Sequence, residues 1–114
     1  MTNQFLGKLY SEITDFTLKD SIERLGELIN VSSCTGFPWD WNDDEDMSIC
    51  ILGTSESQLV KIDGKIMKQL EKETKTTINI TDCYLYASST IDSPRPVIIK
   101  KNDNIYAVCP VIEI

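Results

Sequence analysis

Two short apolar segments near the C-terminus constrain the fold of this chain most strongly. Residues 97–101 and 105–109 are rich in Val, Ile and Tyr, and they are separated by Asn102, Asp103 and Asn104. β-Branched and aromatic side chains favour strands, and Asn and Asp adopt left-handed turn conformations at low cost. This pattern predicts a β-hairpin, so part of the molecule is expected to be an antiparallel sheet.

Helical spacing dominates the first thirty residues. Apolar side chains recur at spacings of one, three and four over residues 3–15, which predicts a helix. A second apolar face from Leu18 to Ile29 predicts another helix, with Thr17 in position to cap its first turn. Gly26 costs about 1 kcal/mol in a helix interior, which is too little to overturn the pattern.

The middle of the chain has the pattern of a strand, a helix and a further strand. Residues 47–53 form a short apolar run that ends in glycine, which is typical of a buried strand. Apolar residues over 56–74 follow helical spacing but are interrupted by Gly64, which predicts either one helix or a helix that begins near Asp63. Alternating and apolar residues over 77–86 then predict a strand with a bulge or an edge position.

The predicted elements give an α+β fold, or an α/β layered fold, in one globular domain of residues 1–114. Two N-terminal helices precede a βαβ unit, whose strands are expected to be parallel and joined by a right-handed crossover. The C-terminal hairpin completes a mixed sheet of about four strands covered by helices. A length of 114 residues is suited to a single domain.

Negative charge is concentrated in one short segment. The chain has a formal net charge of −7, and five of its 18 acidic residues fall within residues 40–46. Without those five, 13 acidic residues face 11 basic ones. Three large aromatic residues, including both tryptophans, lie in or beside the segment. The predicted partner-binding residues are Phe37, Trp39, Asp40, Trp41, Asp43, Asp44, Glu45 and Asp46.

These residue types favour a basic protein as the partner. Aromatic rings supply buried area in interfaces, and carboxylates steer encounter and pair with Lys or Arg. Negative charge repels phosphate backbones and anionic lipid surfaces, so direct binding to nucleic acid or to a membrane is not expected. The alternative is that Trp39 and Trp41 pack inward while the acidic residues form a solvated loop.

The acidic segment also has part of a calcium-loop pattern. Oxygen-bearing side chains alternate from Asp40 to Asp46, as they do in such loops. However, Glu45 stands where the tight turn needs glycine, and Ile51 stands where a bidentate glutamate is needed. A specific calcium site is therefore not predicted.

The cysteines give no metal pattern. No two of the four are closely spaced and the chain has no histidine, so a zinc site is not predicted and no cofactor is expected. Cys50, Cys83 and Cys109 lie in apolar segments and are predicted to be core residues. Cys34 lies in a polar stretch that is predicted to be a loop.

The sequence does not predict an enzyme. Histidine, the commonest general base at neutral pH, is absent, and no nucleophile elbow, phosphate loop or dinucleotide fingerprint is present. Five carboxylates in one loop share one environment, which does not separate an acid from a base. The first residues lack a basic region followed by an apolar stretch, so a cytoplasmic location is expected.

In size, acidity and its localised acidic segment, the chain resembles bacterial immunity proteins and other inhibitors of basic nuclease toxins. This resemblance implies that the acidic segment occupies the basic cleft of a toxin domain, with carboxylates in place of phosphates. Trp39 and Trp41 would then supply buried anchor area. The alternative is a phage or regulatory adaptor that mimics nucleic acid and binds another basic host protein. A small enzyme or a divalent-metal-binding protein is less favoured.

Overall fold

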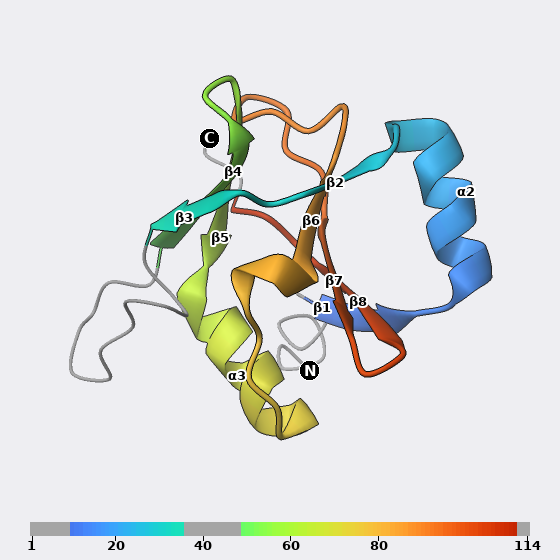
Figure 1. Cartoon of the computed structure of the whole chain (residues 1–114), viewed down its shortest axis with the longest axis vertical. Coiled ribbons are helices and arrows are strands. Elements are labelled where there is room, and N and C mark those ends of the chain that lie inside the picture. The colour runs from blue at the N-terminus through green and yellow to red at the C-terminus, as the bar shows by residue number, and fades with distance from the viewer. Residues whose placement is uncertain (1–9, 36–48, 112–114) are drawn as a thin grey trace, which may run out of the picture.

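The computed structural model describes residues 10–35 and 49–111, in which eight strands form two antiparallel sheets accompanied by two α-helices (Figure 1). The five-stranded sheet has the order β1-β8-β7-β6-β2, and the three-stranded sheet has the order β3-β4-β5. The strands are β1 (Tyr10–Ile13), β2 (Leu28–Asn30), β3 (Ser33–Thr35), β4 (Ile49–Ser55), β5 (Gln58–Asp63), β6 (Cys83–Tyr86), β7 (Val97–Lys101) and β8 (Asn104–Val108). The helices are α2 (Asp15–Leu25), α3 (Gly64–Thr74) and the 3-10 turn η1 (Ile80–Asp82).

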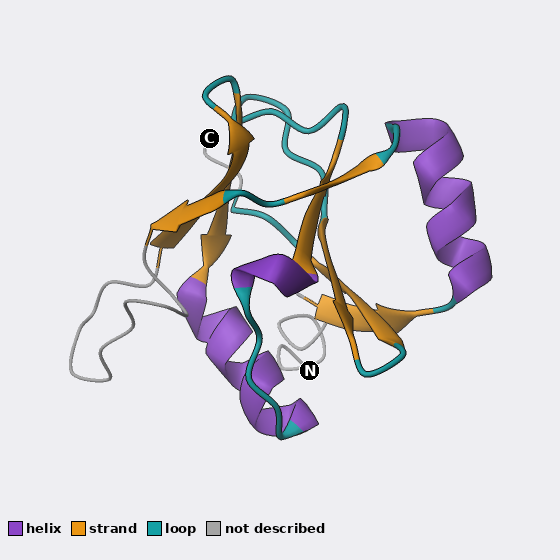
Figure 2. Cartoon of the chain, in the orientation of Figure 1, coloured by secondary structure: helices purple, strands orange, loops and turns teal. Residues whose placement is uncertain are grey.

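The elements stack in three layers. Helix α2 covers one face of the five-stranded sheet, while the three-stranded sheet and α3 cover the other face (Figure 2). Strand β7 illustrates this arrangement because its side chains alternate. Val97 and Ile99 belong to the larger apolar cluster between the sheets, and Ile98 packs in the smaller cluster beneath α2 with Leu18 and Tyr86. The five-stranded sheet is therefore buried on both faces.

The chain passes from one sheet to the other without a turn. The backbone N–H of Val31 donates to the carbonyl of Cys83 in the five-stranded sheet at 2.9 Å. The N–H of the next residue, Ser32, donates to the carbonyl of Gly53 in the three-stranded sheet, also at 2.9 Å. Successive residues of an extended chain direct their amides to opposite edges. The continuous segment from β2 to β3 thus has one sheet on each edge and connects the two.

The predicted pair of N-terminal helices is wrong. Of the first predicted helix, residues 3–9 lie outside the described residues, and Tyr10–Ile13 form β1, which pairs with β8 along its whole length. The apolar residues Tyr10 and Ile13 fit a helical spacing of three. They also fit the two opposite faces of a strand, and pairing with a distant strand decides between the two conformations.

The second predicted helix is shorter than expected and begins earlier. Thr14, rather than Thr17, is the N-cap of α2, and its hydroxyl accepts a hydrogen bond from the N–H of Thr17 at 3.1 Å. The helix ends at Gly26, which has φ 99° and ψ 173°, a conformation that is essentially restricted to glycine. A Cβ at this position would lie 2.9 Å from the Cβ of Ala87. Gly26 therefore terminates the helix instead of weakening its interior, and the chain continues as β2.

The predicted βαβ unit and mixed four-stranded sheet are also wrong. Residues 58–63 form β5, which pairs with β4 as a hairpin, and the helix begins at Gly64 after its N-cap Asp63. Helix α3 then leads to β6 in the other sheet, so it joins no parallel pair. The side chains of Val60 and Ile62 are fully buried between the sheets. Their two-residue alternation belongs to a strand, although the same residues also fit helical spacing.

The C-terminal hairpin is confirmed. Strands β7 and β8 pair with Lys101 opposite Asn104, and Asn102 and Asp103 in the turn have φ values of 52° and 69°. The strand predicted over 47–53 is also present as β4, although its described part runs from Ile49 to Ser55. Local sequence determines both elements, because turn residues and β-branched side chains act over short distances.

Replacement of a side chain between the two sheets should weaken the fold strongly. Leu52 is fully buried, so we expect Leu52→Ala to lower the free energy of unfolding by about 2–5 kcal/mol through lost contacts and a cavity. Phe16 on α2 is 80% exposed, and Phe16→Ala should change stability by no more than about 0.5 kcal/mol. Urea unfolding curves measure both changes. Equal effects of the two substitutions would contradict the layer arrangement.

Candidate functional site

The predicted partner-binding residues, from Phe37 to Asp46, lie outside the described residues, but the structure places both flanks of the segment. Thr35 ends β3 and Ile49 begins β4. These strands are antiparallel neighbours, with Thr35 opposite Ile51. Residues 36–48 therefore join two adjacent strands at one end of the three-stranded sheet (Figure 1).

This end of the sheet is firmly connected to the core. On β4, Cys50 and Leu52 are almost completely buried. Ile49 lies opposite Asp63, whose carboxylate accepts the N–H of Lys65 in the first turn of α3 at 2.9 Å. The start of α3 and the attachment of residues 36–48 consequently share one edge of the molecule.

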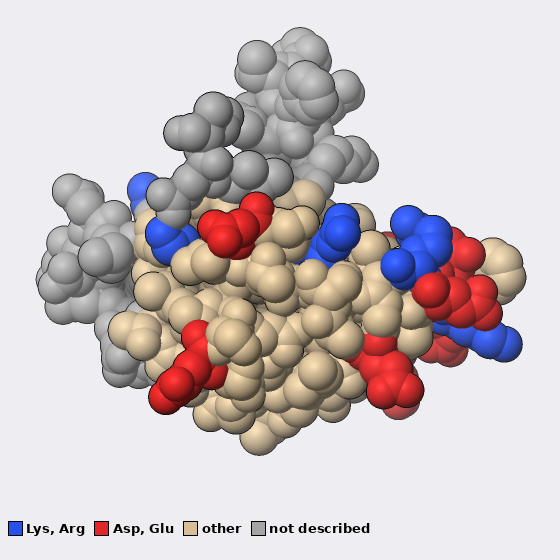
Figure 3. All heavy atoms as spheres, turned by 90° about the horizontal axis from the view of Figure 1, so that it is seen from above, with Lys and Arg blue, Asp and Glu red and all other residues tan. Residues whose placement is uncertain are grey.

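The described part of the chain is close to neutral. Residues 10–35 and 49–111 contain 12 acidic and 10 basic side chains. On the face shown in Figure 3, the two signs are interspersed and are densest over α2, at the right of the view. One contact there is the exposed ion pair between Arg24 and Asp20, at 3.3 Å. The excess of negative charge therefore belongs mainly to the segment that starts after β3.

A groove of about 410 Å³ lies between α3 and the corner of the five-stranded sheet formed by β1, β8 and the β7–β8 turn. We call it the α3–β1 groove. It is lined by Tyr10, Glu12, Leu70, Glu73, Thr74, Thr76, Lys101, Asn102, Asn104 and Tyr106.

Strand register places the sheet residues of this groove on one face. Glu12 lies opposite Tyr106 in the β1–β8 pair, and Lys101 lies opposite Asn104 in the β7–β8 pair. Paired residues project from the same face of a sheet. Tyr106 also packs against the core between the sheets, so the groove opens where that apolar layer ends.

Tyr10 and Glu73 bridge the two walls of the groove. The Tyr10 hydroxyl donates a hydrogen bond to Oε1 of Glu73, and Nε2 of Gln69 donates to Oε2 of the same carboxylate at 3.4 Å. Burial, followed by the hydrogen bond and the negative charge of Glu73, raises the pKa of Tyr10 to about 12. The phenol therefore holds its proton throughout the physiological range.

A half-buried ion pair lies at the edge of the same groove. Nζ of Lys101 is 3.1 Å from Oδ2 of Asp82, and these side chains are 21% and 17% exposed. Asp82 also accepts the backbone N–H of Asn79 at 2.8 Å, in the capping box of η1. The charge of Lys101 is thus largely neutralised by Asp82 and not by the carboxylates of the groove.

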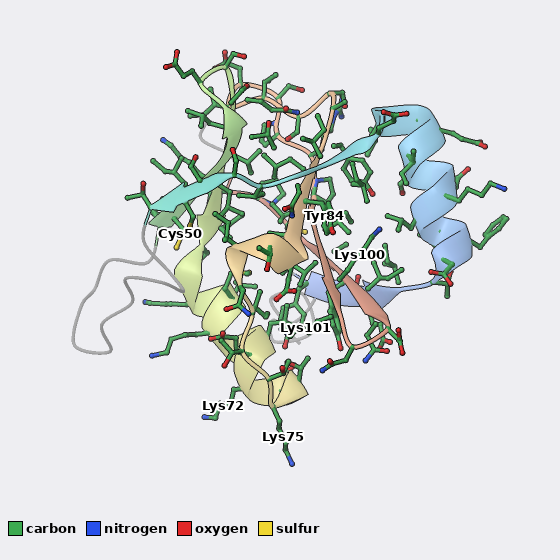
Figure 4. All side chains as sticks on the ribbon, in the orientation of Figure 1. Cys50, Lys72, Lys75, Tyr84, Lys100 and Lys101 are labelled. Atoms are coloured by element: carbon green, nitrogen blue, oxygen red, sulfur yellow. The ribbon has the colours of Figure 1, made fainter. Side chains whose placement is uncertain are left out.

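Two other hollows are more open and are lined by lysines. One, of about 690 Å³, lies at the C-terminal half of α3 beside Lys72 and Lys75, whose side chains project from the end of the helix (Figure 4). The other, of about 440 Å³, lies beside the β7–β8 turn and includes Lys100, whose Nζ is 5.0 Å from the centroid of the Tyr84 ring.

The cysteines only partly match the prediction. Cys50 and Cys83 are buried in the core as predicted. Burial and the nearby charge of Asp82 raise the pKa of the Cys83 thiol to about 12, so it remains protonated and unreactive. Cys109 is exposed, and the prediction for it was wrong because β8 already ends at Val108. Cys34 is half-buried and lies in β3 instead of a loop.

Metal-binding clusters and membrane-spanning helices are both absent from the described residues. Across residues 10–35 and 49–111, no three Cys, Asp or Glu side chains are grouped so that they could hold a metal ion. In the same residues, neither helix has the length and apolar character needed to cross a bilayer.

Comparison with models of known protein families, with curated proteins and with solved structures found no match to this chain. The function of the candidate site is therefore inferred from the chemistry of its residues. Sequence reasoning missed the α3–β1 groove, because residues 10–13 were assigned to a helix and Glu73 was not singled out. Residues 10–13 have no two-residue alternation of apolar and polar side chains, so no local signal marked the strand.

The hydrogen bond between Tyr10 and Glu73 should make stability depend on pH in the alkaline range. The pKa of Tyr10 is about 12 in the folded protein against an ordinary value of 10.0. Folding therefore favours the neutral phenol. Its contribution to stability is complete below about pH 10 and is lost as the pH rises towards 12.

Phenolate absorbance followed during an alkaline titration measures this effect. We expect Tyr10→Phe to remove one titration step near pH 12, whereas Tyr84→Phe, as a matched control, should leave that step in place. A step near pH 12 that survives in Tyr10→Phe would contradict the assignment.

Proposed function

We propose that this chain is a small acidic binding protein of the bacterial cytoplasm, without enzymatic activity of its own, that inhibits a basic nuclease-type toxin by blocking it sterically and electrostatically. The observation that carries the proposal is the concentration of five carboxylates within residues 40–46 in a chain whose described part is nearly neutral. A local negative field attracts a basic surface and accelerates encounter.

The way in which the segment is attached supports this proposal. Its flanks, Thr35 and Ile49, belong to paired strands of the three-stranded sheet. A loop held at both ends by a packed sheet loses less conformational entropy on binding than a free tail does. Interfaces also need buried anchor residues, and Trp39 and Trp41 are of the type most often found in that role.

A regulatory or phage-derived adaptor that binds a different basic host protein is the second candidate. The same segment and the same electrostatic argument favour it. Co-purification from the native cell at low and high salt identifies the partner, because a steered complex is captured at low salt and released at high salt. The activity of the captured protein then separates the two candidates. A captured protein that has nuclease activity, and loses it on addition of this chain, supports inhibition of a toxin. A captured basic protein without nuclease activity supports the adaptor.

Charge reversal within the segment should slow binding to the captured basic partner. We expect Asp43→Lys, Asp44→Lys and Asp46→Lys in combination to lower the association rate about tenfold or more and to abolish its dependence on salt. The matched control reverses Glu23, Glu56 and Asp92, which changes the net charge equally at exposed sites elsewhere. Surface plasmon resonance at low and high salt measures both variants. An unchanged rate in the first variant would rule out the segment as the docking site.

The tryptophans should act through dissociation. We expect Trp39→Ala or Trp41→Ala to weaken binding by about 2–4 kcal/mol if that ring is a central anchor. The loss should appear mainly in the dissociation rate, since steering by the carboxylates is retained. Urea unfolding of the same variants is the control. A loss of protein stability without a loss of affinity would assign the ring to the core of the protein instead.

A further inference from the structure

The α3–β1 groove combines two phenol rings with two carboxylates. Tyr10 and Tyr106 are both half-buried, Glu12 lies on the sheet wall of the groove and Glu73 on the α3 wall. Across the strands, Glu12 is directly opposite Tyr106, and Tyr10 lies two residues away on the same face of β1. Rings and carboxylates are therefore neighbours on one surface and are not merely close in sequence.

The groove carries uncompensated negative charge. Lys101 is engaged by Asp82 at 3.1 Å. Among residues 10–35 and 49–111, the hydrogen bonds to the Glu73 carboxylate come from the neutral groups of Tyr10 and Gln69. Glu12 is exposed and has no hydrogen-bond or ion-pair partner among the described residues. Within the described part of the chain, the two glutamates therefore contribute two negative charges that no ion pair balances.

We propose that the α3–β1 groove binds an arginine side chain of a protein partner. A guanidinium is planar, stacks on aromatic faces and donates up to five hydrogen bonds, which matches phenol rings beside carboxylates. The side-chain oxygens of Asn102 and Asn104 at the turn add neutral acceptors. A volume of about 410 Å³ accommodates the side chain together with part of its backbone.

The position of the groove relates it to the proposed function. Helix α3 starts beside Ile49, where residues 36–48 rejoin the sheet, and Glu73 lies nine residues further along the helix. At 1.5 Å per residue the two places are about 14 Å apart along the helix axis. An interface of ordinary size, about 800 Å² per partner, spans that separation. Engagement of one basic partner at both places rests on the proposed function, whereas the chemistry of the groove does not.

Nuclear magnetic resonance with an acetylated, amidated tri-arginine peptide tests the groove directly. We expect saturable shifts of the backbone signals of Glu12, Glu73 and Tyr106, and no such shifts with a tri-glutamate peptide. Tri-lysine should bind more weakly, because an ammonium lacks the planar fork. If the signals of these residues do not shift, the proposal is wrong.

Variants assign the interaction to particular groups. Glu12→Gln alters an exposed side chain that has no hydrogen-bond or ion-pair partner among the described residues. Together with Glu73→Gln, it should weaken binding of the tri-arginine peptide about tenfold. Tyr106→Leu keeps both carboxylates and should weaken binding of the tri-arginine peptide about threefold through loss of the aromatic ring. The control, Glu56→Gln with Asp92→Asn, removes two exposed carboxylates elsewhere and should leave affinity unchanged. An equal loss of affinity in this control would mean that net charge alone causes the effect, and it would contradict the proposed arginine site in the groove.

A third variant separates the groove from the acidic segment. Asp43→Asn, Asp44→Asn and Asp46→Asn in combination should leave the tri-arginine shifts at Glu12 and Tyr106 in place. If the peptide shifts only the signals of Thr35 and Ile49 in the unmodified protein, the proposed arginine site in the groove is wrong and the proposed function is unaffected. Conversely, groove shifts that persist while the captured basic partner binds equally well with and without the three aspartates would support the groove and contradict the proposed function.

Discussion

The apolar layer between the two sheets is the interaction on which the rest of the structure depends. Leu52, Val60 and Ile62 from the three-stranded sheet meet Val97 and Ile99 from the five-stranded sheet, and all are fully buried. Each sheet has an apolar face that must be buried against another layer, so each depends on this contact. Helix α3 joins this layer through Met67 and Leu70, which fixes the helix against both sheets.

The candidate binding features lie at the borders of this layer. Where β4 leaves the core, the chain connects to the acidic segment through Ile49. Where the layer ends beneath α3, polar residues replace apolar ones and the α3–β1 groove opens. The packed interior therefore holds the groove and the two flanks of the acidic segment, Thr35 and Ile49, in place. The groove and the sequence of the acidic segment are both rich in carboxylates, as the proposed binding of a basic protein requires.

Sequence reasoning succeeded where structure is local and failed where distant segments compete. The hairpin around Asn102 and Asp103 was predictable because left-handed turn residues act within a few positions. Tyr10–Ile13 were assigned to a helix, and residues 58–63 to a helix or to the stretch before one that begins near Asp63, because their apolar spacing fits both periods. Pairing with β8 and β4, respectively, settles the conformation, and that pairing is not visible within a window of ten residues.

The sequence by itself determined the concentration of charge and aromatic rings at residues 37–46 and the hairpin near the C-terminus, because composition and turn chemistry do not depend on distant contacts. Only the tertiary structure decided that all the described strands are antiparallel and that they form two sheets. It also brought Glu12 and Tyr106 beside Glu73, residues that are far apart in the chain. Such juxtapositions follow from burial of a shared apolar layer, a property of the whole chain and not of any segment.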